Sequence, residues 1–180
     1  MRKLNCLIFL SIVAHSYANC EYTPSGVSCD KTMVENLIAT GIVTLKGTVV
    51  DKSTKVSGIF SADKAQLHDL SVQGKANINS SKIDGKCNIR GYLESDSSIF
   101  KKSLHLSSNE AKLRNSEIGT NIEINHSIGT PRLILSGTSI VSGNIKFIGS
   151  YGEVIKDKSV IIRGKLINGS IKEGGITNVK

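Results

Sequence analysis

Two carboxylates recur at the same place in a repeated stretch of the chain. Asp63 and Asp96 are separated by steps of sixteen and seventeen residues, with Asn79 between them. If successive repeats stack about 4.8 Å apart, the two acids stand about 10 Å from each other, near the upper limit for an inverting glycosidase. Asp and Asn are also the residue types that turns require. We therefore favour a turn role and keep Asp63 and Asp96 as weak catalytic candidates.

A second set of polar residues alternates along the same repeats. Its members are Gln73, Lys75 and Asn77 in one repeat and Arg90, Tyr92 and Glu94 in the next. Alternate residues of a strand share one face, and repeat proteins commonly bind partners through such faces. The set predicts a flat polar face with one aromatic ring that holds a glycan or a protein. An ordinary hydrated sheet face is the favoured alternative.

The cysteines indicate one disulfide and one buried thiol. Cys20 and Cys29 flank a short turn-forming stretch, so an oxidising compartment favours a bridge between them. The rival reading is lipidation of Cys20, but Asn19 stands before it where that signal needs a small residue. Cys87 lies among apolar strand positions and has no identifiable base nearby, so we expect a small buried side chain.

No metal site or cofactor site is expected. His68, His105 and His126 share no short spacing with Cys, Asp or Glu, so neither a metal quartet nor a catalytic triad can be drawn. The repeat lacks the Asp-rich pattern of calcium-binding β-rolls, and no glycine loop of the phosphate-binding kind occurs. Glycosylation sequons at Asn79, Asn125 and Asn168 have meaning only in a eukaryotic secretory pathway.

These side chains are positioned by an internal repeat. Three segments, starting at Val56, Val72 and Ile89, carry apolar or small residues at offsets 0, 2, 4, 6, 9 and 11, with glycine always at offset 2. Steps of two place side chains on one face of a strand, and the step of three turns the chain at a corner. A circuit of sixteen or seventeen residues leaves no room for a crossover helix, so each coil completes its core by stacking on its neighbours.

The repeat predicts an all-β fold, a single-stranded parallel β-helix of about seven coils of sixteen to twenty-two residues. Weaker copies begin at Leu45 and Ile162, and loops at 127–131 and 149–152 take up extra length. We expect residues 42–170 to form this solenoid. We expect residues 19–41 to form a cap with the candidate disulfide and a short helix from Asp30 to Ala39, and residues 171–180 to form a polar tail.

The first eighteen residues are typical of a secretory signal. Arg2 and Lys3 precede an apolar run, and Ser16, Tyr17 and Ala18 make a small-x-small cleavage site. The run is too short to span a bilayer, and no later segment is long enough. The sequence predicts a secreted or periplasmic protein without a transmembrane segment.

Composition and charge limit the classes of partner that the protein can bind. The chain has a formal charge of +8, no Trp and only 4% aromatic residues. Loss of residues 1–18 leaves twenty-one basic and fifteen acidic residues, which fits a hydrated surface or attraction to anionic glycans, headgroups or nucleic acid. Interleaved aromatics and a recognisable module for nucleic acid are both lacking, so that partner is disfavoured.

The pattern resembles the bactofilin-like, polymer-forming β-helices. Their run of Val, any residue, Gly, then a Ser or Ala corner is matched at Val56/Gly58, Val72/Gly74, Ile89/Gly91 and Ile162/Gly164, across residues 42–170. The resemblance implies the fold and a tendency to self-associate. Bactofilins are cytoplasmic and lack the paired cysteines of the cap, and in both respects this chain departs from them.

Three functions remain, in order of preference. The first is an exported, non-catalytic structural or binding protein that presents a β-helical face to a cell-surface component, glycan or protein. The second is a small polysaccharide-processing β-helix enzyme, and the third is a self-assembling β-helix. An enzyme of the second kind needs a groove lined by grouped acids and bases, which the sequence does not offer.

Overall fold

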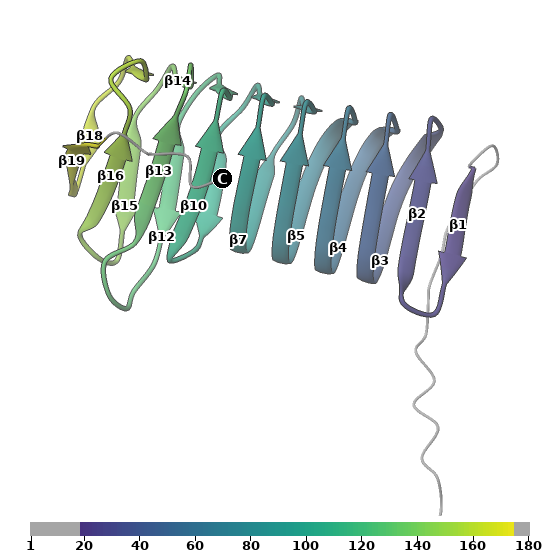
Figure 1. Ribbon diagram of the computed structural model, residues 1–180. Coiled ribbons are helices and arrows are strands. Elements are labelled where there is room, and N and C mark those ends of the chain that lie inside the picture. Colours follow the sequence, from purple (N-terminus) through teal and green to yellow (C-terminus); the bar gives the residue numbers. More distant parts are fainter. Residues whose placement is uncertain (1–18, 175–180) are drawn as a thin grey trace, which may run out of the picture.

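The computed structural model describes residues 19–174 as an elongated stack of parallel β-coils (Figure 1). The stack has about nine turns and contains no helix in the described part of the chain. The all-β parallel solenoid that the repeat predicts is therefore confirmed, although it has about two more coils than expected. The predicted signal segment, 1–18, and most of the predicted polar tail, 175–180, lie outside the described residues.

Each coil has two long sides and one short side. The front side of Figure 1 consists of β2 (Gly26–Asp30), residues 42–46 of β3 (Met33–Lys46), 59–63 of β4 (Val49–Asp63), 75–79 of β5 (Gln66–Asn79), 92–96 of β7 (Cys87–Asp96), β10 (Glu110–Arg114), β13 (Arg132–Ser136), β16 (Gly152–Lys156) and β19 (Gly169–Glu173). The short side consists of the first two residues of β3, β4 and β5, then β6 (Lys82–Ile83), β8 (Ile99–Phe100), β11 (Glu117–Ile118), β14 (Ile140–Val141) and β17 (Ile161–Ile162).

The back side closes the circuit. It consists of residues 36–40 of β3, 53–57 of β4, 69–73 of β5, 87–90 of β7, β9 (Leu104–Ser107), β12 (Ile122–Asn125), β15 (Ile145–Ile148) and β18 (Leu166–Ile167). Every neighbouring pair from β2 onward is parallel, and the register shifts at the corners between Val34 and Asn36 and between Val50 and Ser53. Among the described strands, only β1 (Cys20–Thr23) pairs antiparallel, with β2.

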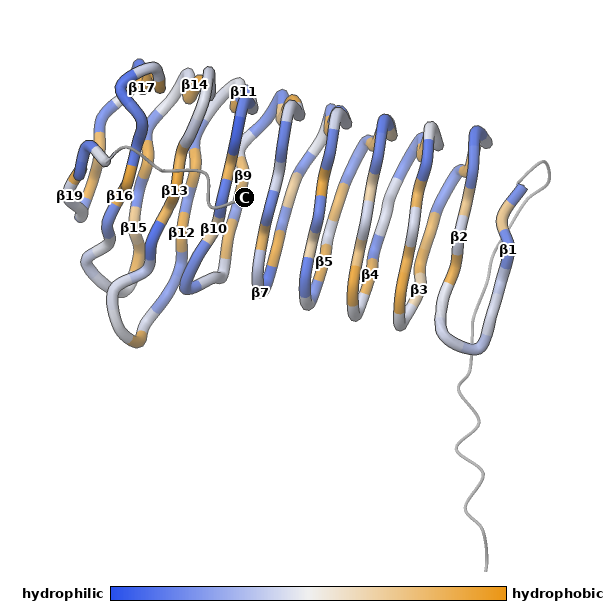
Figure 2. The backbone as a smooth tube through the Cα atoms, viewed as in Figure 1, coloured by the Kyte–Doolittle hydropathy of each residue, from blue (hydrophilic) through white to orange (hydrophobic). Residues whose placement is uncertain are grey.

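The core is a thin column of side chains enclosed by the three sides. The offsets predicted to point inward do so: Phe60, Ala62, Ala65 and Leu67 are all buried, and the next two coils repeat the arrangement. Figure 2 shows the resulting alternation of hydrophobic and hydrophilic residues along the strands. Full burial of one such aliphatic side chain contributes about 1.5–3 kcal/mol, so many modest contributions hold the stack together.

A column of glycines forms the sharp corner between the back and front sides. Gly74 has a φ of 136°, and a Cβ atom there would lie 2.0 Å from the carbonyl oxygen of Gly58. Gly58 and Gly91 pack against their neighbours in the same way. Only glycine accepts both the left-handed conformation and this close approach of two backbones, which explains why offset 2 never varies.

A column of buried hydroxyls forms the corner between the front and short sides. It contains Thr48, Ser81, Ser98, Ser116 and Ser139, all buried, and Ala65 takes the corresponding position in one coil. The Ser98 hydroxyl accepts a hydrogen bond from the Ser81 amide at 3.2 Å and donates one to the Asp96 carbonyl at 2.9 Å. Ser116 and Ser139 repeat this bond to the coil before them. The hydroxyls thus satisfy backbone groups where the turn interrupts the ladder.

The N-terminal region corrects one prediction. Residues 30–39 do not form a helix, because Met33–Lys46 is a strand that stacks on Val49–Asp63. Val34 and Leu37 are buried, whereas Met33 and Ile38 are more than half exposed. An irregular step between Val34 and Asn36 rounds the corner, and it produces the three-residue spacing that imitates a helical stripe. This coil, which begins with β2, adds one turn before residue 42, where the solenoid was expected to begin.

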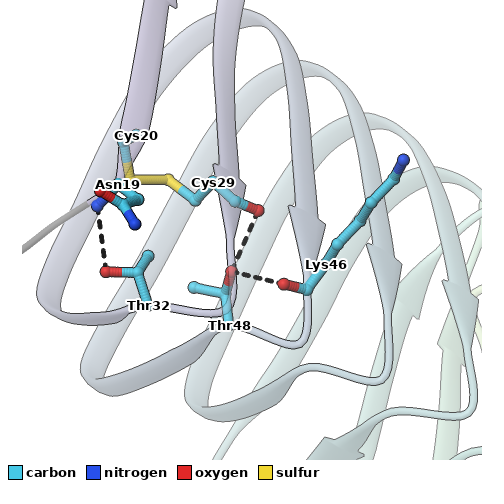
Figure 3. Close-up of a disulfide and its surroundings, with 6 residues drawn as sticks. All are labelled: Asn19, Cys20, Cys29, Thr32, Lys46 and Thr48. Carbon is cyan, nitrogen blue, oxygen red and sulfur yellow. Dashed lines mark hydrogen bonds between the residues drawn. A yellow bond between two sulfur atoms is a disulfide. The ribbon is translucent and has the colours of Figure 1, made fainter.

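The disulfide joins the first two strands (Figure 3). Cys20 and Cys29 are paired residues of the β1–β2 hairpin and are bonded to each other, so the predicted bridge is confirmed. Nearby, Thr48 donates a hydrogen bond to the Cys29 carbonyl at 3.1 Å, and the Asn19 amide donates one to Thr32. Within this hairpin, β1 lies against the edge of β2 that faces away from the solenoid. It thereby covers an edge strand whose backbone groups would otherwise be unpaired.

Coil length changes along the stack. Val43 lies opposite Phe60 and Phe60 opposite Ala76, steps of seventeen and sixteen residues. Ala111 lies opposite Leu133, a step of twenty-two. The extra residues lie in loops at 126–131 and 149–151 and at the corner around 137–139, so the loop signals in the sequence marked the correct region.

The two weaker sequence copies belong to other corners. Gly47 lies at the turn between the front and short sides, and Gly164 lies between the short and back sides, packed on Gly143. Neither occupies the column of Gly74. No helix long and apolar enough to cross a bilayer occurs among residues 19–174.

We predict that Gly74→Ala lowers the free energy of unfolding by at least about 2 kcal/mol, because it adds both backbone strain and steric overlap. Urea denaturation followed by circular dichroism measures the loss. Gly129→Ala is the matched control, since φ is 80° there and a Cβ would meet no atom within 4 Å; about 1 kcal/mol is expected. Equal losses would show that backbone packing does not require Gly74.

We predict that Ser98→Ala lowers the unfolding free energy by about 1–3 kcal/mol, because the buried Ser81 amide loses its acceptor. Ser97→Ala, at the exposed neighbouring position, is expected to change it by less than about 0.5 kcal/mol. The same denaturation experiment compares them. A Ser98 variant as stable as the Ser97 variant would contradict the role of the hydroxyl column.

Candidate functional site

The two candidate catalytic acids lie in one column of the front side. Asp63 is paired with Asn79, and Asn79 with Asp96, on successive coils. Asp96 is bound from the next coil: Arg114 forms an ion pair with it at 2.5 Å, and Asn115 donates a hydrogen bond at 3.2 Å. These contacts make Asp96 part of the corner structure, as the turn interpretation expected.

The pKa of Asp96 fits the same structural role. Partial burial raises it, but hydrogen bonds from Arg114, Asn115 and Ser97 outweigh this effect and leave the pKa below its usual value. A general acid in a glycosidase needs the opposite shift. Asp96 therefore stays ionised and paired at neutral pH.

The predicted binding face is divided between two sides of the solenoid. Lys75, Asn77, Tyr92 and Glu94 lie on the front side, where Lys75 and Lys112 place their ammonium groups 5.4 and 5.9 Å from the centre of the Tyr92 ring. The phenol also raises the pKa of Lys112. Intramolecular cation–π contacts thus already occupy the single aromatic ring of this face.

Gln73 and Arg90 lie on the back side instead. The glycine corner at Gly74 and Gly91 separates them from Lys75 and Tyr92. The sequence pattern continued its alternation through this corner, so it gave no sign that the chain changes direction there. Gln73 and Arg90 contribute to a different feature.

That feature is a groove on the back side, with a volume of about 500 Å³. It crosses five successive strands and is lined by Ser71, Val72, Gln73, Asn88, Ile89, Arg90, His105, Leu106, Ser107, Glu123, Asn125 and Ile148. Four inter-strand steps of about 4.8 Å give it a length of about 19 Å. Its outward polar side chains are amides, hydroxyls, a guanidinium, an imidazole and the carboxylate of Glu123, and Ile148 adds a partly exposed apolar side chain at one end. We call it the back groove.

A paired histidine and glutamate lie within the back groove. His105 Nδ1 is 3.1 Å from Glu123 Oε2, and the two residues are register partners on β9 and β12. This pair was not predicted from the sequence, where only short spacings of His with Cys, Asp or Glu were considered, because the partners are eighteen residues apart. One coil length is the signal that finds them. Among residues 19–174, no serine or cysteine is hydrogen-bonded to His105, so the pair lacks a nucleophile.

Two loops border one end of the back groove. The loop 126–131 follows Asn125, and the loop 149–151 follows Ile148. They are joined by a hydrogen bond from the Ser150 hydroxyl to the His126 carbonyl at 2.7 Å. Ile128 and Tyr151, which these loops carry, are 80% and 58% exposed. The loops therefore expose an apolar and an aromatic side chain, each three residues beyond a groove residue in the sequence and neither of them part of the groove lining.

Two other kinds of candidate site, a metal site and a reactive cysteine, find no support in the described part of the chain. Within residues 19–174, no group of three or more His, Cys, Asp or Glu side chains is placed to hold a metal ion. Cys87 is buried, as predicted, and burial raises the pKa of its thiol far above the usual range. It is consequently unreactive at neutral pH.

Comparisons with family models, curated proteins and solved structures gave no match for this chain. The resemblance to bactofilin-like proteins therefore extends to the parallel β-solenoid fold alone. The site must be interpreted from its own geometry.

We predict that Asp96→Asn destabilises the protein at pH 7 and that this difference disappears in acid. Because the folded-state pKa of Asp96 is lowered, its stabilising contribution is full above the unfolded value near 3.9 and is lost as pH falls through the folded value. Thermal unfolding of both proteins between pH 7 and pH 2.5 measures it. Asp63→Asn, in the same column, is the control. A pH-independent difference would contradict the assignment.

Proposed function

We propose that this chain is an exported, non-catalytic binding protein whose back groove holds a glycan chain. The observation that carries the proposal is the lining of the groove, where amide and hydroxyl side chains repeat over four of its five strands. Such groups exchange hydrogen bonds with sugar hydroxyls as readily as with water. An extended polymer lying along the solenoid axis meets an outward side chain every ~4.8 Å.

Export is supported by the signal-like residues 1–18 and by the disulfide Cys20–Cys29, which forms in oxidising compartments. The exposed ring of Tyr151 gives a sugar a surface for stacking next to the polar lining. Catalysis is disfavoured because the only described acid–base pair of the groove, His105 with Glu123, is neither a carboxylate pair nor linked to a nucleophile.

We predict that the protein binds at least one polymer on an array of neutral and acidic cell-wall polysaccharides, and that Gln73→Ala combined with Asn125→Ala weakens binding about tenfold or more. Loss of two hydrogen-bonding groups at about 1 kcal/mol each accounts for this factor. Asn77→Ala with Glu94→Ala, on the front side, is the matched control. Binding to no polymer by the folded protein contradicts the proposal, and loss of binding in the front-side variant alone moves the site to the front.

Self-assembly is the second candidate, and one observation favours it. In the last described coil, Ile171 occupies the inward column of Val154 but is 45% exposed, whereas Val154 is fully buried. The repeat resembles that of the polymer-forming bactofilins, which self-associate. An uncovered terminal coil would allow this chain to associate with a second copy in the same manner. Light scattering across a hundredfold range of concentration tests it, and a constant monomer mass excludes it.

A further inference from the structure

The charges of the described chain are distributed unevenly between the two long sides. The front strands are balanced, with acids Asp30, Asp63, Glu94, Asp96, Glu110, Glu153 and Glu173 and cations Lys46, Lys75, Lys112, Arg114, Arg132, Lys156 and Lys172. The excess positive charge must therefore lie elsewhere. Most of it lies at the corner between the short and back sides, which borders the back groove; the groove lining itself holds one cation, Arg90, and one carboxylate, Glu123.

From residue 84 onward, the back strands and the short-to-back corner carry many more cations than acids. The cations are Lys86, Arg90, Lys101, Lys102, Lys146, Arg163 and Lys165, and the acids are Asp84 and Glu123. Both acids are already paired. Asp84 lies 2.8 Å from Lys101 and 3.3 Å from Lys82, and Glu123 is bound to His105.

Most of these cations have no intramolecular ion pair. Among the described residues, Lys86, Arg90 and Lys102 have no carboxylate within 4.0 Å, and all three side chains are exposed. Arg90 lines the back groove itself. Lys86 and Lys102 precede the groove residues Asn88 and His105 by two and three residues, about 7–10 Å along a strand. A polymer in the groove therefore runs beside a row of free cations.

We propose that the glycan held by the back groove is acidic, with carboxylate or sulfate groups repeated along the chain. This inference rests on the proposed function and specifies the class of its ligand. Anions repeated along an extended polymer can pair with Arg90 in the groove and with Lys86 and Lys102 on two neighbouring coils at its border. Each pairing releases a counterion, so the interaction weakens as salt concentration rises.

The test compares two polymers with one backbone. Polygalacturonate carries a carboxylate on every sugar, and its fully methyl-esterified form carries none. The expected result is that the chain binds polygalacturonate at least tenfold more tightly than the ester at low salt, and that the difference shrinks between 50 and 500 mM NaCl. Equal binding of both polymers overturns the acidic specificity and leaves the proposed glycan site standing. Binding of neither polymer, nor of heparin as the sulfated probe, overturns the acidic specificity; the proposed function fails as well only if the polysaccharide array is also negative.

Variants with equal net charge separate the site from general attraction. Lys86→Gln, Arg90→Gln and Lys102→Gln together are expected to reduce polygalacturonate affinity on the order of 100-fold at low salt, since cations near an anionic surface act almost additively. The control is Lys46→Gln, Lys75→Gln and Arg132→Gln on the balanced front side, with an expected change below about threefold. Circular dichroism confirms that both variants are folded. Equal losses in the two variants overturn the inference.

Discussion

Hydrogen bonding between the backbones of successive coils is the constraint on which the rest of this structure depends. From β2 onward, each coil is paired in parallel with the coils before and after it. A coil of sixteen residues encloses too little apolar surface to be stable alone, so its strands and core exist only within the stack. The corners are where this ladder is most easily lost, and the chain maintains it there in two ways. Glycines such as Gly74 let backbones touch, and hydroxyls such as that of Ser98 replace missing backbone partners.

The same constraint determines how side chains meet on the surface. Residues one coil apart in the sequence become neighbours about 4.8 Å apart, so pairs form between positions one coil length apart, such as seventeen residues for Asp84 and Lys101 and nineteen for Glu153 and Lys172. Asp96 with Arg114 and His105 with Glu123 are both of this kind. A ligand that uses such a surface must itself be extended and repetitive, because the surface offers similar groups at equal intervals. This is the physical reason that the back groove suits a polymer better than a small molecule.

The sequence predicted the features that depend on strict repetition. It did not predict the features that depend on where the chain changes direction. Phe60, Ala76 and Leu93 were placed in the core because their offsets agree over three coils, and the structure buries all three. The glycine corner was not recognised as a change of direction, because the inward–outward alternation continues through Gly74. Gln73 and Lys75 were consequently assigned to one face, although they lie on two. Met33 to Ile38 imitated a helix, since one irregular step in a strand gives the same spacing as a helical turn.

The position of the back groove follows from the change in coil length. Coils of sixteen or seventeen residues have corners so tight that nothing projects from them, and their outer surface is nearly flat. The groove begins on those coils at Ser71 and Asn88 and ends at Asn125 and Ile148, where the coils lengthen and loops project. Ile128 and Tyr151 rise from these loops on a support that the regular coils keep rigid. The strict repeat supplies evenly spaced polar groups, and the relaxed repeat supplies a border that distinguishes one end of the proposed polymer site from the other. Neither part alone provides both an extended and a bounded site, so the boundary between them is where this fold is best able to bind a ligand.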